Sequence, residues 1–98
     1  MASALLIERL GLPPLYQAHV RYRREPRGRE RWQLAPETYQ LGYGDCEDLA
    51  TWRAAELWLG GWPARPVVYR AGPHQLHVIV NKGDGTYEDP SRVLGMGR

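Results

Sequence analysis

The segment from Cys46 to Leu59 constrains the fold most strongly, because it predicts a helix that has to be buried. Asp45 is a favourable N-cap residue, and Asp48 lies three residues later, as in a capping box built from two carboxylates. The glycines at positions 60 and 61 end the helix. Apolar side chains reach most of its circumference, which is typical of a central helix that other elements cover on several sides.

Three strand-like runs follow this helix, at residues 65–70, 74–80 and 86–89. Turn-forming residues at 71–73 and 81–85 separate them. One central helix packed on a small antiparallel sheet makes an α+β fold. The chain has 98 residues, enough for one modest core, so we expect residues 1–98 to form a single domain.

The chain before the central helix predicts three shorter elements. Residues 4–10 predict a short helix, and a second short helix starts near Pro36. From Tyr16 to Tyr22, apolar and polar residues alternate with a period of two, which predicts a half-buried strand with a basic outer face. The turn residues Pro26-Arg27-Gly28 end that strand.

The arginines are numerous but do not indicate nucleic-acid binding. The net charge is only +2, although six arginines fall between positions 21 and 31. Lys82 is the only lysine against twelve arginines, so the cluster reflects a general preference for arginine. We therefore expect a solvated loop or hairpin there, with an anion-binding patch as the weaker alternative.

Composition also bears on the compartment. No apolar run approaches the roughly 20 residues of a membrane span, so we expect no membrane partner. The first residues lack the basic region of a secretory signal. One cysteine cannot form an internal disulfide, and a reducing compartment is the simpler setting. These features favour the cytoplasm.

Cys46, His77 and Asp89 supply, in that order, the parts of an activated nucleophile. The predicted helix places the thiol at its first turn, where the helix dipole carries about half a positive charge and lowers a thiol pKa. A neighbouring imidazolium has the same effect. The carboxylates of Asp45, Glu47 and Asp48 surround the thiol with negative charge and act in the opposite direction. The site therefore needs a cation beside the sulfur, and His77 is the candidate.

The predicted hairpin gives a geometric check on the last two residues. If residues 81–85 form the loop, counting outward pairs Val80 with Thr86 and places His77 directly opposite Asp89. Directly opposed residues point to the same face of a sheet, with Cβ atoms about 4.5–5.5 Å apart. That distance suits a carboxylate that orients an imidazole. A slip of one residue would separate the two side chains.

A metal site is the other chemistry that these residue types allow. One cysteine with scattered histidines lacks the paired ligand spacing of a structural zinc site. Asp45, Glu47 and Asp48 carry oxygen ligands suited to calcium, but helix capping already accounts for two of them. We therefore expect no metal and no other cofactor. His19 and His74 are expected to face away from the site.

From about Trp32 to Met96, the chain resembles the transglutaminase-like superfamily of cysteine enzymes, whose core is related to that of papain-like peptidases. The block around the cysteine is the most specific part, and the histidine and aspartate blocks match in order and spacing. The resemblance rests on Trp32-Gln33 with Pro36-Glu37-Thr38, Gly44-Asp45-Cys46-Glu47-Asp48-Leu49-Ala50, His77-Val78-Ile79-Val80 and Glu88-Asp89-Pro90-Ser91.

Two groups within the superfamily are most similar. The stretch from Trp32 to Ala50 is similar to bacterial transglutaminase-like cysteine proteinases, some of which use acidic residues for calcium. The small size and the C-terminal block are more similar to short proteins encoded by phages and prophages. The chain is far shorter than the secreted proteinases, and Val78-Ile79-Val80 follows the histidine where many members carry a tryptophan.

The resemblance implies a role for each site residue. It implies that Cys46 is the nucleophile, His77 the general base and acid, and Asp89 the residue that orients His77. It also implies a papain/transglutaminase-like core, with the helix that carries the nucleophile packed on a small antiparallel sheet. Gln40 lies six residues before the cysteine, like the oxyanion glutamine of papain-like enzymes; a polar turn residue is the equal alternative.

These observations predict a thiol-dependent hydrolase, a peptidase or amidase, that acts through a thioester on a peptide or protein substrate. If an amine intercepted the thioester, the same site would transamidate. A partner protein that completes the cleft would suit so small a chain. The alternative is a non-catalytic binding or assembly module, such as a phage virion or assembly component. A phage-encoded protein would be virion-associated rather than cytoplasmic.

Overall fold

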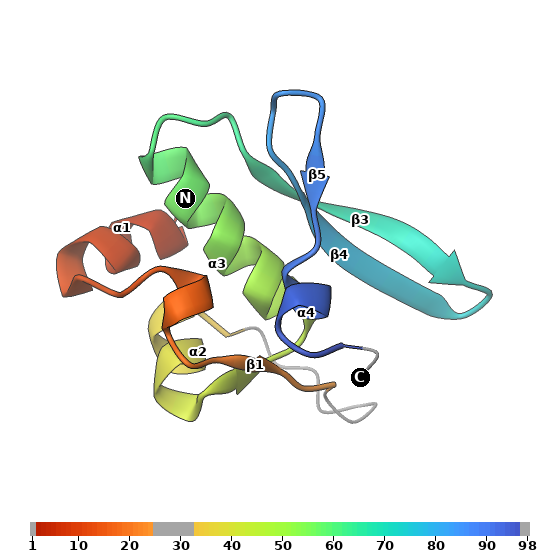
Figure 1. Ribbon diagram of the computed structural model, residues 1–98, viewed down its shortest axis with the longest axis horizontal. Helices are drawn as coiled ribbons and strands as arrows, with labels where there is room; N and C mark the ends of the chain where they lie inside the picture. The colour runs from red at the N-terminus through yellow and green to blue at the C-terminus, as the bar shows by residue number, and fades with distance from the viewer. Residues whose placement is uncertain (1, 25–32, 97–98) are drawn as a thin grey trace.

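The computed structural model describes residues 2–24 and 33–96, which form a small α+β fold (Figure 1). The helices in these residues are α1 (Ala2–Leu10), α2 (Ala35–Leu41), α3 (Cys46–Leu59) and α4 (Pro90–Val93), and a 3-10 turn, η1 (Leu15–Gln17), follows α1. The antiparallel sheet has the order β3 (Arg65–Gly72), β4 (Gln75–Asn81), β5 (Tyr87–Glu88). A separate parallel pair joins β1 (Arg21–Tyr22) to β2 (Tyr43–Gly44).

Helix α3 has the bounds that the sequence predicts. The Asp45 carboxylate accepts the backbone N–H of Asp48 at 3.0 Å, and the Asp48 carboxylate accepts the N–H of Asp45 at 3.1 Å. This reciprocal pair is the capping box, and it satisfies two backbone donors that a helix start leaves free. The helix ends at Gly60, and Gly61 then adopts a positive φ of 95°.

Helix α3 lies between the helices α1 and α2 and the antiparallel sheet (Figure 1). Apolar clusters on both sides of α3 explain its apolar circumference. On one side, Leu49, Trp52 and Ala55 pack with residues of α1, α2 and the chain around η1. On the other side, Ala50 and Ala54 let the sheet approach closely. The residues that pack there from outside the helix are Ala64, Val78 and Val80. Burial around the helix stops near its end, because Trp58 is 50% exposed and Leu59 38% exposed.

The strand predicted from Tyr16 to Tyr22 is wrong for most of its length. Residues 15–17 form the 3-10 turn after two prolines, and His19 has a positive φ of 59°, which interrupts an extended backbone. Only Arg21 and Tyr22 are in a strand, β1, and that strand pairs in parallel with β2. The alternation itself is present in the burial, since Ala18 and Val20 are buried while His19 and Arg21 are exposed.

The β4–β5 hairpin differs in register from the prediction. Val80 pairs with Glu88, and Asn81 with Tyr87, so the loop begins one residue later than expected. His77 is therefore not directly opposite Asp89. Local hydrogen bonds organise the loop, because the Asn81 side chain accepts the N–H of Gly83 at 2.9 Å and the Lys82 N–H donates to the Thr86 carbonyl at 3.1 Å. The sequence alone did not reveal which residues would make these bonds.

Some predictions fall on residues outside the described ranges. They are the turn Pro26-Arg27-Gly28, the arginines at positions 27, 29 and 31, and Trp32. The described helices include none with both the length and the apolar character that crossing a membrane requires.

Gly83 and Gly85 offer a matched test of how the β4–β5 loop is held. Both have a positive φ, 85° and 91°, so either Gly→Ala change costs about 1–2 kcal/mol of stability from backbone strain. A Cβ at Gly83 would also lie within 3.0 Å of the carbonyl carbon of Pro63, whereas nothing lies within 4 Å of a Cβ at Gly85. We expect Gly83→Ala to lower the free energy of unfolding clearly more than Gly85→Ala in urea titrations. Equal losses would show that Pro63 does not restrain the loop.

Candidate active site

Cys46 is the first residue of α3 and lies where the helix start meets the sheet. Its side chain is partly exposed and packs against the cluster that contains Ala50 and Val78. The capping box fixes this turn, because Asp45 and Asp48 hold the residues on both sides of the cysteine. The sulfur therefore combines a fixed position with partial access to solvent, which a nucleophile requires.

His77 and Asp89 form the contact that the sequence predicts. The His77 Nε2 and Asp89 Oδ2 atoms are 2.8 Å apart, and the histidine side chain is only 5% exposed. An ionised carboxylate can only accept a hydrogen bond, so Nε2 donates to it and Nδ1 keeps its lone pair. Asp89 also caps α4 by accepting the N–H of Arg92, which fixes the carboxylate that orients the ring.

The contact forms although the predicted register is wrong. The observed pairs shift the hairpin by two residues relative to the prediction, and a shift of two keeps each side chain on its original face. If the register of the Val80–Glu88 pair is extended by one residue, Asp89 lies opposite Ile79. Asp89 is then on the face that carries Ile79 and His77. His77 and Asp89 are then diagonal rather than direct neighbours, and diagonal neighbours remain within reach of long side chains.

Val78 connects the thiol to the histidine strand. Cys46 packs against the cluster that contains Val78, whose backbone amide lowers the pKa of the thiol against the larger effect of burial. Val78 follows His77 directly in β4. The main chain of β4 therefore passes beside the sulfur at the residue next to His77. Within the described ranges, no hydrogen bond joins the thiol to the imidazole itself.

Two tyrosines at this site were not assigned to it from the sequence. Tyr69 lies directly opposite His77 in the β3–β4 register, and its ring packs edge-on against the imidazole with centroids 5.6 Å apart. Burial raises the pKa of the Tyr22 phenol, and the charges of Cys46 and Asp89 raise it further. Tyr22 therefore lies within electrostatic range of both. The turn predicted at residues 71–73 was a signal for the position of Tyr69 in the hairpin. Tyr22 is brought to the site by the β1–β2 pairing, which has no local signal.

The surroundings of Cys46 disfavour its thiolate. Burial raises the pKa of the thiol most, and the negative charges of Asp45 and Glu47 raise it further. The backbone amides of Val78 and Glu47 act in the opposite direction but do not reverse the shift. The thiol is therefore protonated at neutral pH in the unliganded protein, and reaction requires a base that removes its proton.

Asp48 ties the cysteine turn to the preceding chain. Its side chain is buried, and Oδ1 accepts the N–H of Gln33 at 3.1 Å while Oδ2 accepts the N–H of Asp45. Gln33 is itself buried and donates through its side chain to Thr38 and to the Tyr43 carbonyl. Burial raises the pKa of Asp48 to about 7, although the two amides favour its charged form. This network holds residues 33–48 around the start of α3.

The remaining candidates have weaker links to the site. Gln40 is exposed on the last turn of α2, and it makes no hydrogen bond to Cys46 in the part of the chain that the structure describes. Its oxyanion role stays a prediction. His19 and His74 are exposed. No group of three or more His, Cys, Asp or Glu in residues 2–24 and 33–96 is arranged to hold a metal ion.

Asp48 gives the protein a pH dependence of stability with a defined sign. The unfolded carboxyl loses its proton near pH 4, whereas the folded one keeps it up to about pH 7. The contribution of Asp48 is therefore full below pH 4 and falls as pH rises to about 7. We expect the free energy of unfolding of wild type minus that of Asp48→Asn to decrease across this range in urea titrations. Parallel curves for the two proteins would contradict this.

Asp89 allows its two roles to be separated. Asparagine is as good an N-cap as aspartate, so Asp89→Asn keeps the α4 cap while it removes the charge beside His77. Alanine removes both. We expect Asp89→Ala to be less stable than Asp89→Asn by about 1 kcal/mol in urea or thermal unfolding. Equal stability of the two variants would show that the cap does not contribute.

Comparison with known proteins leaves the geometry as the basis for function. No family model matches the chain, and searches of curated proteins and of solved structures found no significant match. The resemblance stated above therefore rests on the sequence blocks quoted there, and it stays a prediction.

Proposed function

We propose that this protein is a thiol-dependent hydrolase of amide or peptide bonds, with Cys46 as nucleophile, His77 as general base and acid, and Asp89 as the residue that orients His77. The observation that carries the proposal is the buried His77, paired with Asp89, on the strand whose next residue, Val78, belongs to the cluster against which Cys46 packs. A histidine held by a carboxylate beside a cysteine at a helix start is the arrangement that nucleophilic catalysis uses.

The architecture supports the same proposal. A helix with the nucleophile at its first turn packs on an antiparallel sheet that supplies the histidine, and the aspartate follows the next strand. We infer that this is a small papain/transglutaminase-like core.

The reaction follows from the protonation states at the site. As the sulfur approaches a substrate carbonyl carbon, Nδ1 of His77 accepts the thiol proton, and the sulfur–carbon bond forms. The backbone N–H of Cys46 belongs to the helix start and donates to the oxygen that becomes negative. The intermediate collapses to a thioester while His77 returns the proton to the leaving amine. Water completes hydrolysis, and an amine in its place completes transamidation.

The raised pKa of Cys46 suits this order of events. A thiol that is protonated in the free protein is activated only when a base takes its proton, so His77 acts during attack rather than through a resting ion pair. Substrate also displaces water from the site, which strengthens the interaction between the imidazolium and the negative charge that forms.

The second candidate function is a non-catalytic binding or assembly module that keeps this fold, as in a phage virion or assembly component. The absence of a hydrogen bond between Cys46 and His77 within the described residues favours it. In such a module the cysteine would be a partly buried packing residue.

Alkylation by iodoacetamide between pH 5 and 9 distinguishes the two functions. If His77 accepts the thiol proton as the sulfur attacks the reagent, His77→Ala removes this general base and lowers the rate at pH 7 by about 100-fold or more, the lower end of what general-base catalysis contributes. We expect Asp89→Asn to slow the reaction in the same direction. The measurement is the second-order rate of Cys46 modification, followed by mass spectrometry.

His74→Ala is the matched control, because His74 is exposed in the turn between β3 and β4. Its rate should equal that of the wild type at every pH. A wild-type rate that follows an ordinary thiol and does not change in His77→Ala would exclude the hydrolase mechanism and leave the assembly module.

A further inference from the structure

The register of the sheet divides its side chains between two faces. On one face, Val78 and Val80 pack against α3. Cross-strand partners share a face, so the opposite face is set by the pairs that include His77 and Asn81. It carries Arg65, Val67 and Tyr69 of β3, His77, Ile79 and Asn81 of β4, and Tyr87 of β5. The sheet face that carries His77 therefore extends along β4 from His77 to Asn81 and its partner Arg65.

This second face is open to solvent beyond His77. Tyr69 is 43% exposed and Tyr87 62% exposed, while Val67 and Ile79 between them are half-buried. The helix that packs extensively on both β3 and β4 is α3, and it occupies the other face. Figure 1 shows the β3–β4 hairpin reaching out beyond the helices. The half-buried apolar side chains of Val67 and Ile79 therefore lie between His77 and the other end of β4.

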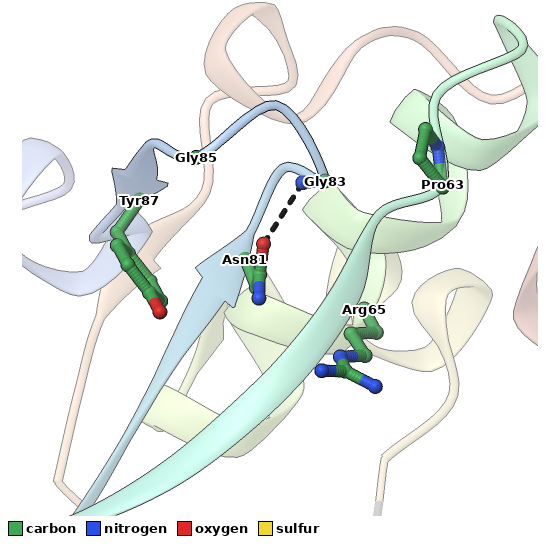
Figure 2. Close-up of a pocket in the computed structure, with 6 residues that line it drawn as sticks. All are labelled: Pro63, Arg65, Asn81, Gly83, Gly85 and Tyr87. Atoms are coloured by element: carbon green, nitrogen blue, oxygen red, sulfur yellow. Dashed lines mark hydrogen bonds between the residues drawn. The ribbon is translucent and has the colours of Figure 1, made fainter.

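A cavity lies at that far end of the face. Its volume is about 360 Å³, and Figure 2 shows its lining residues between the start of β3 and the β4–β5 loop. They are Pro63, Arg65, Asn81, Gly83, Gly85 and Tyr87. Three of them, Arg65, Asn81 and Tyr87, are cross-strand partners on the face that carries His77.

Arg65 makes this cavity cationic. Its guanidinium forms no ion pair with any carboxylate of the described residues. Lys82 adds a second positive charge nearby and lies over the Trp62 ring at 5.5 Å. The closest loop carboxylate, Asp84, is turned toward Thr86, which donates to it from both the backbone and the hydroxyl. A carboxylate from another molecule that enters this cavity would therefore meet an arginine that has no ion pair within the described residues.

The spacing sets which carboxylate would fit. Asn81 is four residues from His77 along β4, which is about 13 Å in a strand. An extended peptide advances by about the same length per residue. A peptide whose attacked carbonyl lies beside His77, and which follows the strand on this face, therefore places a side chain four residues away near Arg65.

We propose that the open face from His77 to Arg65 is the substrate-docking surface, and that it takes an extended acidic peptide with a carboxylate about four residues from the bond that is attacked. The apolar floor of Val67 and Ile79 contacts the intervening residues, and Arg65 pairs with the carboxylate. The position of the attacked bond rests on the proposed function. The path of the peptide and the place of its carboxylate rest on the strand register and on the cavity.

Protection of Cys46 from iodoacetamide tests the docking surface. The probe is a nonapeptide with leucine at its centre, alanine elsewhere and aspartate at both ends, so that either chain direction places an acid four residues from the centre. The comparison peptide carries asparagine at both ends. We expect the aspartate peptide to protect the thiol about fivefold better than the asparagine peptide, the effect of one exposed ion pair.

Matched variants locate the carboxylate. Arg65→Gln should remove the preference for aspartate, and Arg65→Lys should keep part of it. Arg70→Gln is the control, because Arg70 is exposed on the same strand but belongs to the opposite face. It should keep the full preference. Circular dichroism confirms that each variant is folded.

Several results would overturn the proposal: equal protection by the two peptides, no protection by either at millimolar concentration, or a preference that survives in Arg65→Gln. Failure of the hydrolase mechanism is separate, because iodoacetamide also modifies an unactivated thiol and protection can still be measured. An ordinary thiol with Arg65-dependent protection would keep the docking surface and reject catalysis. An activated thiol without Arg65-dependent protection would keep the hydrolase mechanism and reject the docking surface.

Discussion

The packing of α3 between two apolar clusters is the constraint on which the rest of the structure depends. Trp52 faces one cluster and Ala54 the other, and both are fully buried. Each large apolar side chain buried in this way contributes about 1.5–3 kcal/mol. Because both sides of the helix are covered, its start cannot move relative to β4. The meeting of Cys46 with the Val78 amide is a consequence of that packing.

The same helix start creates an electrostatic conflict at the thiol. Carboxylates at Asp45 and Asp48 cap the helix and join it to Gln33, so they stabilise the turn that positions the sulfur. Negative charge and burial at that turn also raise the thiol pKa, against the effect of the helix dipole. A nucleophile in this position requires a base from another element. His77 on β4, oriented by the Asp89 carboxylate, meets that requirement in the function that we propose.

How well the sequence predicts each element depends on how local its causes are. The bounds of α3 follow from an adjacent cap and adjacent glycines, and they are confirmed. The strand from residue 16 to 22 fails because His19 leaves the extended region, although the burial still alternates. The β4–β5 register shifts because side-chain bonds within the loop select a different pairing. The shift is an even number of residues, so the two site residues keep a common face.

By itself, the sequence determined where α3 begins and ends, which face of the hairpin carries the histidine, and that the thiol has acidic neighbours, because capping, alternation and charge act over a few residues. Only the tertiary structure decided that Tyr22 and Tyr69 join the site, that burial raises the thiol pKa, and that Arg65 lines a cavity on the same face as His77. These properties arise from contacts between distant segments, and no local pattern encodes the distance between them.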